Sequence, residues 1–166
     1  MKLQIPICVK DELIYKISSY ERDDIMIYAK CIRESQIAKS ASEFQKRQNE
    51  ENHVYCIGQT TVSKNGFDIL YCVPLNFIYD CLKYGRYIAI IDADDDSLEY
   101  PYKSSYMGLQ RCTSEQLVIN IMDSQDEQTI DYIFNEVGNA DLVHDGYVHT
   151  LPDNIQKYFR KKQENC

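Results

Sequence analysis

The chain has 166 residues, enough for one domain of ordinary size, and 44% of them are hydrophobic, which permits a substantial buried core. Its 26 acidic and 18 basic residues give a net charge of −8. Binding to nucleic acid depends on Lys and Arg side chains that neutralise phosphates, so this balance argues against a nucleic-acid-binding protein. An acidic surface instead favours a basic protein partner.

The seven cysteines are odd in number, contain no C-x-x-C pair and lie partly inside apolar runs. This pattern argues against a secreted disulfide framework and against a zinc module, so we interpret the cysteines as reduced, mostly buried thiols. The apolar stretch near the N-terminus is too short for a signal peptide and is interrupted by Pro6. No run reaches transmembrane length. We expect a cytoplasmic protein with no cofactor and no membrane association.

The first third of the chain predicts an edge strand followed by a long helical region. Apolar residues alternate over residues 2–9, and Pro6 would restrict that strand to a sheet edge. From residue 11 to about 51 the pattern is helical, with a stripe formed by Ile25, Tyr28, Ala29 and Ile32. Residues 40–52 contain almost nothing to bury. They predict a polar linker or a solvated helix end, with a partner-binding helix as the alternative.

The clearest local signal in the sequence is a hairpin over residues 54–73. Two β-prone runs flank Asn65–Gly66, a pair that supplies the positive φ angles of a tight turn. A helix at 75–84 follows, with Gly85 as its C-terminal stop, and then a buried strand at 87–92. We expect the hairpin and this strand to share one sheet, with the helix packed on it.

In the second half of the chain, the run QLVINIM is ambiguous between helix and strand. Its β-branched content suits a strand, while a helix would bring together Leu117, Val118, Ile121 and Met122. A helix is predicted over residues 124–138, with a capping box formed by Ser124 and Glu127, and a short helix over 153–162. Helices and hairpins without regular βαβ alternation predict a single α+β domain over residues 1–166, with a small, mainly antiparallel sheet.

A dense acidic cluster follows the strand at 87–92. If the strand continued, Asp92, Asp94 and Asp96 would share one face, and carboxylates at this spacing can hold Mg²⁺ or Mn²⁺. The segment GRYIAIIDADD resembles the metal- and sugar-nucleotide-binding segment of GT-A glycosyltransferases, but the nucleotide site that such enzymes place before it is missing. We interpret the cluster as a solvated acidic loop and keep the metal site as the alternative.

Three tyrosines stand beside these aspartates in a segment that is too polar to form a core. Aromatic side chains in such surroundings are typical anchors of protein interfaces. The alternative is that the rings cover the sheet of the domain itself. The predicted partner-binding residues are Tyr100, Tyr102, Tyr106, Asp94, Asp95 and Asp96.

Residues 77–140 carry a family resemblance. The segments FIYDCLKYGRYIAIID, QLVINIMDS and DEQTIDYIFNEVGNADLV resemble the region that precedes the repeats in mimivirus-type giant-virus ankyrin-repeat proteins. No repeat array follows, so the resemblance implies a stand-alone domain of this type. It further implies a viral protein that acts in the host cytoplasm by protein contact, and it implies no catalytic residues.

Together these observations predict a non-enzymatic, cytosolic protein-interaction module. Tyrosines and acidic residues are also the side chains with which small inhibitors neutralise basic toxins or enzymes, so an acidic immunity protein is one alternative. A divalent-metal-dependent transferase or hydrolase that uses Asp92, Asp94 and Asp96 is the other.

Overall fold

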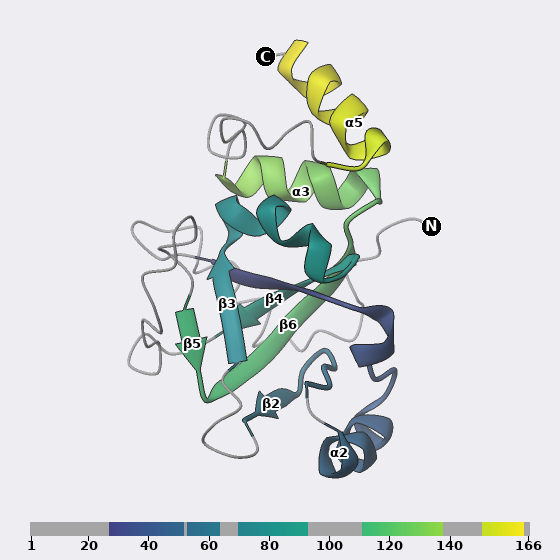
Figure 1. Ribbon diagram of the computed structural model, residues 1–166, viewed down its shortest axis with the longest axis vertical. Helices are drawn as coiled ribbons and strands as arrows, with labels where there is room; N and C mark the ends of the chain where they lie inside the picture. The colour runs from purple at the N-terminus through teal and green to yellow at the C-terminus, as the bar shows by residue number, and fades with distance from the viewer. Residues whose placement is uncertain (1–26, 52, 64–69, 93–110, 138–150, 165–166) are drawn as a thin grey trace.

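The structure is a computed structural model (Figure 1). It describes residues 27–51, 53–63, 70–92, 111–137 and 151–164. The strand predicted at residues 2–9 and the predicted turn at Asn65–Gly66 lie outside these ranges.

Six strands form one sheet in the order β2-β6-β4-β1-β3-β5, and every neighbouring pair is antiparallel. Helices pack on this sheet, which confirms the predicted α+β fold. The strands are β1 (Tyr28–Ile32), β2 (Thr60–Val62), β3 (Leu70–Pro74), β4 (Tyr87–Asp92), β5 (Arg111–Thr113) and β6 (Glu115–Asp123).

The helices lie in two groups (Figure 1). The 3₁₀ helix η2 (Leu75–Tyr84) lies against the sheet, α3 (Glu127–Val137) lies beside it, and α5 (Asp153–Glu164) follows beyond α3. At the opposite end of the molecule, α2 (Ala41–Glu50) lies near β2. A single 3₁₀ turn, η1 (Glu34–Gln36), follows β1.

The alternation of side chains along β4 divides the core in two. Ile88 and Ile90 join the larger cluster, which the sheet shares with η2, α3 and α5. Ala89 and Ile91 face the other side and join a smaller cluster around Tyr55. Both faces of the central strands are therefore buried.

The helical stripe predicted from Tyr28, Ala29 and Ile32 is wrong, because these residues form the strand β1. This strand pairs with β3 on one side and β4 on the other. Ala29 packs in the larger cluster and Ile32 in the smaller one. A strand buried on both faces has no polar alternation, so its apolar run cannot be distinguished from a buried helix by periodicity.

The predicted hairpin over residues 54–73 is also wrong. β2 pairs with β6, and β3 pairs with β1 and β5, so the two runs stand near opposite edges of the sheet. An Asn-Gly pair specifies a local chain reversal only, whereas strand pairing is decided by which neighbours bury the apolar side chains. Both runs do belong to one sheet, and the strand at 87–92 joins it with η2 packed on it, as predicted.

The ambiguous run QLVINIM is part of β6, and it contains a bulge. Ile90 pairs with Asn120 but Ile91 pairs with Val118, so Ile119 is an extra residue on this strand. The bulge shifts the alternation by one residue. Met122 consequently faces the larger cluster with Ile119, while Val118 and Ile121, three positions apart, both face the smaller one. The helix-like spacing in the sequence is produced by this bulge.

Helix α3 confirms the helix predicted after residue 124, but its N-terminus differs. The Oδ1 atom of Asp126 accepts a hydrogen bond from the backbone N–H of Gln128 at 2.9 Å. Asp126 is therefore the N-cap, and the capping box predicted from Ser124 and Glu127 is wrong. The first helical residue is Glu127, so Ser124 lies too early in the chain to cap it. The helix predicted at 153–162 is confirmed as α5.

Residues 40–52, predicted to be a polar linker or a solvated helix end, contain α2 as a helix of its own. Ser40 caps it by accepting a hydrogen bond from the backbone N–H of Glu43 at 3.1 Å. Most of the helix is exposed, but Phe44 is only 1% exposed and packs in a small third cluster. Sequence patterning missed this anchor because a single aromatic residue produces no periodicity.

We predict that Phe44→Ala lowers the free energy of unfolding by about 3–5 kcal/mol, since it removes a buried ring and leaves a cavity. Urea denaturation measures the change. Lys46→Ala, on the exposed surface of the same helix, should change stability by less than about 0.5 kcal/mol. Equal effects of the two substitutions would show that α2 is not anchored by Phe44.

Gly85 ends η2, but its φ angle of 167° is extended and requires no glycine. The requirement is steric instead. A Cβ atom at this position would lie 2.2 Å from both the carbonyl carbon and the carbonyl oxygen of Ile32. The chain after η2 thus crosses the end of β1 in direct backbone contact, which only glycine permits.

We therefore expect Gly85→Ala to destabilise the protein by about 1–3 kcal/mol, the usual cost of forcing extra atoms into a packed site. Gly58→Ala shows the cost of backbone strain alone, because a Cβ atom there would meet nothing within 4 Å while the φ of +82° disfavours alanine. Thermal unfolding of both variants tests the contact. An unchanged melting temperature for Gly85→Ala would contradict it.

Candidate functional site

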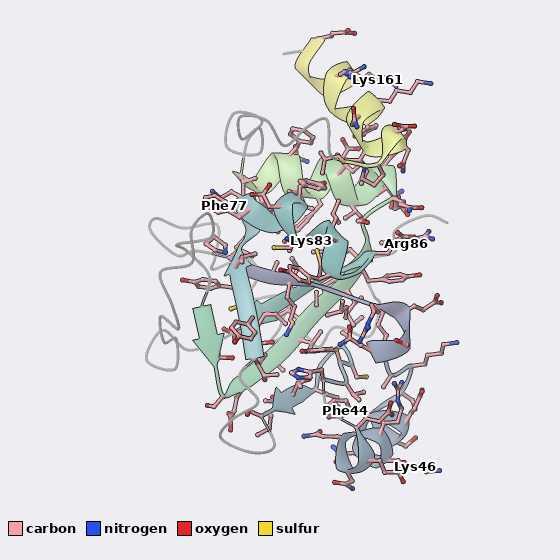
Figure 2. The ribbon with its side chains drawn as sticks, in the orientation of Figure 1. Phe44, Lys46, Phe77, Lys83, Arg86 and Lys161 are labelled. Atoms are coloured by element: carbon pink, nitrogen blue, oxygen red, sulfur yellow. The ribbon has the colours of Figure 1, made fainter. Side chains whose placement is uncertain are left out.

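An open hollow of about 220 Å³ lies where four segments meet: the end of β1, the end of η2, the turn after β6 and the start of α5. Three basic side chains line it, from Arg33, Lys83 and Arg86, together with the ring of Tyr84. Figure 2 shows Lys83 and Arg86 on the part of the molecule below α3, with Arg86 pointing outward. Lys83, Tyr84 and Arg86 are neighbours in the sequence, whereas Arg33, the turn after β6 and Pro152 are brought to them by the fold.

Arg86 is held by a bidentate ion pair with Asp123. Its Nε atom donates to Oδ1 at 2.9 Å and its Nη2 atom donates to Oδ2 at 2.7 Å. The hydrogen bond from Arg86 lowers the pKa of the Asp123 carboxyl, and the backbone N–H of Gln125 contributes to the same effect. The Asp123 side chain is 8% exposed and that of Arg86 is 50% exposed. A buried carboxylate therefore fixes a guanidinium whose Nη1 group lies outside the pair.

Tyr84 presents the most exposed large hydrophobic side chain among the described residues, at 56%. The Nζ atom of Lys83 lies 5.1 Å from the centre of its ring, within range of a cation–π interaction. The apolar side chains of Leu82 and Pro152 line the hollow beside it. The backbone beneath the ring is fixed by the contact of Gly85 with the end of β1.

The hollow is a locally basic site on an acidic protein. Asp123 neutralises Arg86 directly. The hydrogen bonds that Arg86 donates to Asp123 raise the pKa of Arg86 most strongly, and the nearby charge of Glu34 raises it further. The charged residues among the described lining of the hollow are Arg33, Lys83 and Arg86, and all three are basic. The local sign of the charge is therefore opposite to the net charge of −8.

A second polar constellation lies beside the smaller core, around Lys30 of β1. Its Nζ atom donates to the Tyr55 hydroxyl at 2.5 Å and to Oε1 of Gln116 at 3.2 Å. The Gln116 amide in turn donates to the carbonyl oxygen of Tyr71 at 3.1 Å. Burial lowers the pKa of Lys30 to about 8, and the nearby Cys72 partly opposes this shift. Burial also raises the pKa of the Tyr55 hydroxyl.

The Lys30 network connects the sheet to the segment that covers its second face. Tyr55 is completely buried, and its backbone exchanges hydrogen bonds with Gln36 and Ala38 on either side of Ile37. An amine with a pKa near 8 is the kind of group that enzymes use as a nucleophile or base. Here the Lys30 amine donates to the Tyr55 hydroxyl and the Gln116 side-chain amide, so its hydrogen bonds connect parts of the structure to one another.

Most of the site residues predicted from the sequence lie outside the described part of the chain. This holds for Asp94, Asp95 and Asp96 and for Tyr100, Tyr102 and Tyr106. Asp92 is described, and it is the last residue of β4, paired with Leu117 of β6. Within the described ranges, no three His, Cys, Asp or Glu residues gather as a metal site. The acidic surface and the metal alternative both stay predictions.

No strong sequence pattern marks the residues of the hollow. The signal available was weak: the stretch KYGR, Lys83–Arg86, places two cations and a tyrosine around a glycine at the end of a predicted helix. Arg33 and the turn after β6 have no such signal, because their part in the site depends on strand pairing. The expectation for the cysteines is better matched, since Cys31, Cys56, Cys72 and Cys81 are buried and reduced.

Comparison of the chain with protein-family models, with curated proteins and with solved structures returned no match. Within the described residues, no helix combines the length and the apolar character needed to cross a membrane.

The lowered pKa of Lys30 predicts a specific dependence of stability on pH. Between about pH 8 and the ordinary lysine pKa of 10.5, the unfolded chain binds the Lys30 proton more fully than the folded chain. The free energy of unfolding should therefore rise with pH in this range, by an amount on the order of 1–2 kcal/mol between pH 7.5 and 9.5.

Chemical denaturation of the wild type and of Lys30→Met at several pH values measures this contribution. Titration of other groups is shared by the two proteins, so the difference between their curves isolates Lys30. In Lys46→Met, which alters an exposed lysine of α2, the wild-type slope should be retained. Parallel curves for wild type and Lys30→Met would refute the prediction.

Proposed function

We propose that the protein is a non-enzymatic interaction module that binds a protein partner at the hollow beside Tyr84. The observation that carries the proposal is the exposed Tyr84 ring, flanked by Lys83 and Arg86 and mounted on fixed backbone. Tyr and Arg are enriched among the residues that dominate the binding energy of protein interfaces.

The rigidity of this surface supports the proposal. Arg86 is fixed by both oxygens of Asp123, and the backbone N–H of Ser124 donates to the carbonyl oxygen of Arg86 at 3.1 Å. Gly85 is held against the end of β1. Side chains that are already ordered in the unbound protein lose little conformational entropy on binding, so more of the contact energy appears as affinity.

The resemblance to the repeat-flanking region of giant-virus ankyrin-repeat proteins is compatible with this function. It spans residues 77–140, which include the end of η2 and the turn after β6 that form most of the hollow. On this basis we propose that the protein acts in the cytoplasm, and in the host cytoplasm if it is viral. Inhibition of a toxin or enzyme, as by an immunity protein, would be one form of the same function.

Photo-crosslinking tests the proposal. A photoreactive phenylalanine analogue at position 84 should capture a defined protein from native lysate, while the same analogue at Val62 should not. Val62 is 41% exposed and lies on β2, the edge strand nearest to α2, so it controls for exposure alone.

With the captured partner purified, Tyr84→Ala should weaken binding by about 2 kcal/mol, roughly 30-fold, as expected for a central aromatic contact. The melting temperature of the free protein should be nearly unchanged because the ring is largely exposed. Val62→Ala should change neither quantity. Unchanged affinity in Tyr84→Ala would overturn the proposal.

A further inference from the structure

We infer that the hollow recognises an acidic peptide segment of the partner, with a Glu or Asp carboxylate bound at Arg86 and Arg33 and an apolar neighbour on Tyr84. This inference rests on the proposed function and names the chemistry of the partner at the same site. Four observations support it: the basic lining of the hollow, the orientation of Arg86, the hydrogen bonds already made by the backbone N–H groups of the turn after β6, and the apolar part of the lining.

The charge of the hollow selects for an anion. The charged residues among its described lining are all basic, namely Arg33, Lys83 and Arg86. The rest of the molecule carries the excess negative charge, as its net value of −8 shows. An acidic segment is therefore repelled by most of the surface and attracted at this place, which confines it to the hollow.

The Arg86 guanidinium has the geometry for one further carboxylate. Asp123 occupies the edge formed by Nε and Nη2, so the Nη1 group lies outside the pair. Because the guanidinium is planar and held in place, these donors have a fixed direction. Half of the side chain is exposed, so a ligand can reach them. Arg33, on the exposed segment after β1, lines the same hollow.

The backbone around the hollow disfavours a phosphate group as the ligand. One common type of phosphate site uses several backbone N–H groups directed at one point. Here the N–H of Ser124 donates to the carbonyl oxygen of Arg86, and that of Gln125 donates to Oδ1 of Asp123 at 3.0 Å. The donors of this turn are thus already used inside the protein, and binding is left to side chains.

The apolar part of the lining points to a peptide rather than a small acid. Leu82, Tyr84 and Pro152 lie beside the basic side chains in the same hollow. An isolated carboxylic acid would leave this surface in contact with water. A peptide segment in which an acidic residue adjoins an apolar one can contact the basic and the apolar parts of the lining together. The Tyr84 ring beside the Lys83 ammonium is a typical surface for such a segment.

A titration with defined probes tests the inference on the intact protein. The probes are a capped hexapeptide of alternating Glu and Leu, inorganic phosphate and capped hexalysine, each followed by amide and Arg Nε signals in NMR spectra. The Glu–Leu peptide should shift the signals of Arg86, Ser124 and Gln125. Phosphate at the same concentration should shift these signals little, and hexalysine should shift signals of residues outside the hollow.

Matched charge reversals separate the site from general electrostatics. Arg33→Glu and Lys46→Glu change the net charge equally, but only Arg33 lines the hollow, while Lys46 lies on α2 at the far end of the molecule (Figure 2). Arg33→Glu should weaken binding of the Glu–Leu peptide at least tenfold, and Lys46→Glu less than twofold. Equal effects, equal binding of phosphate at the hollow or no peptide binding would each overturn the inference.

The two proposals fail in different ways. If Tyr84 crosslinks a partner but the Glu–Leu peptide does not bind, the protein is an interaction module whose partner has another chemistry. If the peptide binds at the hollow but no partner depends on Tyr84, the acidic-peptide site stands and the proposed function falls.

Discussion

Burial of β1 on both faces is the constraint on which the rest of this structure depends. The strand lies between β3 and β4, so its backbone N–H and C=O groups are satisfied by pairing on two sides. Its side chains must then be buried by other segments on both faces of the sheet. Helices η2, α3 and α5 bury them on one side, and the segment around Tyr55 buries them on the other. The two core clusters, one on each face of the sheet, follow from the central position of β1.

Lys30 and Asp123 are tolerated in their positions because each has hydrogen-bond partners within the protein. Lys30 places a charge beneath the second face, and Tyr55 and Gln116 supply its acceptors. Removing water from such a group costs free energy unless hydrogen bonds replace the lost ones, and the lowered pKa of Lys30 reflects that cost. Asp123 presents the opposite case, since its pairing with Arg86 lowers the pKa of the carboxyl.

The basic hollow is a consequence of the same strand arrangement. Gly85 lets the chain after η2 cross the end of β1, which brings Arg86 beside the last residue of β6, Asp123. The turn that leads into α3 then closes the hollow against Tyr84. A surface formed in this way is rigid, because each of its walls is also part of the packing of the domain.

The sequence by itself determined the class of fold and most of the elements after residue 70. The helices near 75–84, 127–137 and 153–164 have apolar stripes or terminal signals that act within a few residues, and these local preferences survive in the structure. What only the tertiary structure decided is which strands pair. Tyr28–Ile32 has no alternation because both faces are buried, and a bulge at Ile119 gives β6 a helix-like spacing. The stretch Lys83–Arg86 is local in the sequence, but the approach of Arg33 and of the turn after β6 to it depends on that pairing, since residues distant in sequence meet only once the sheet has formed.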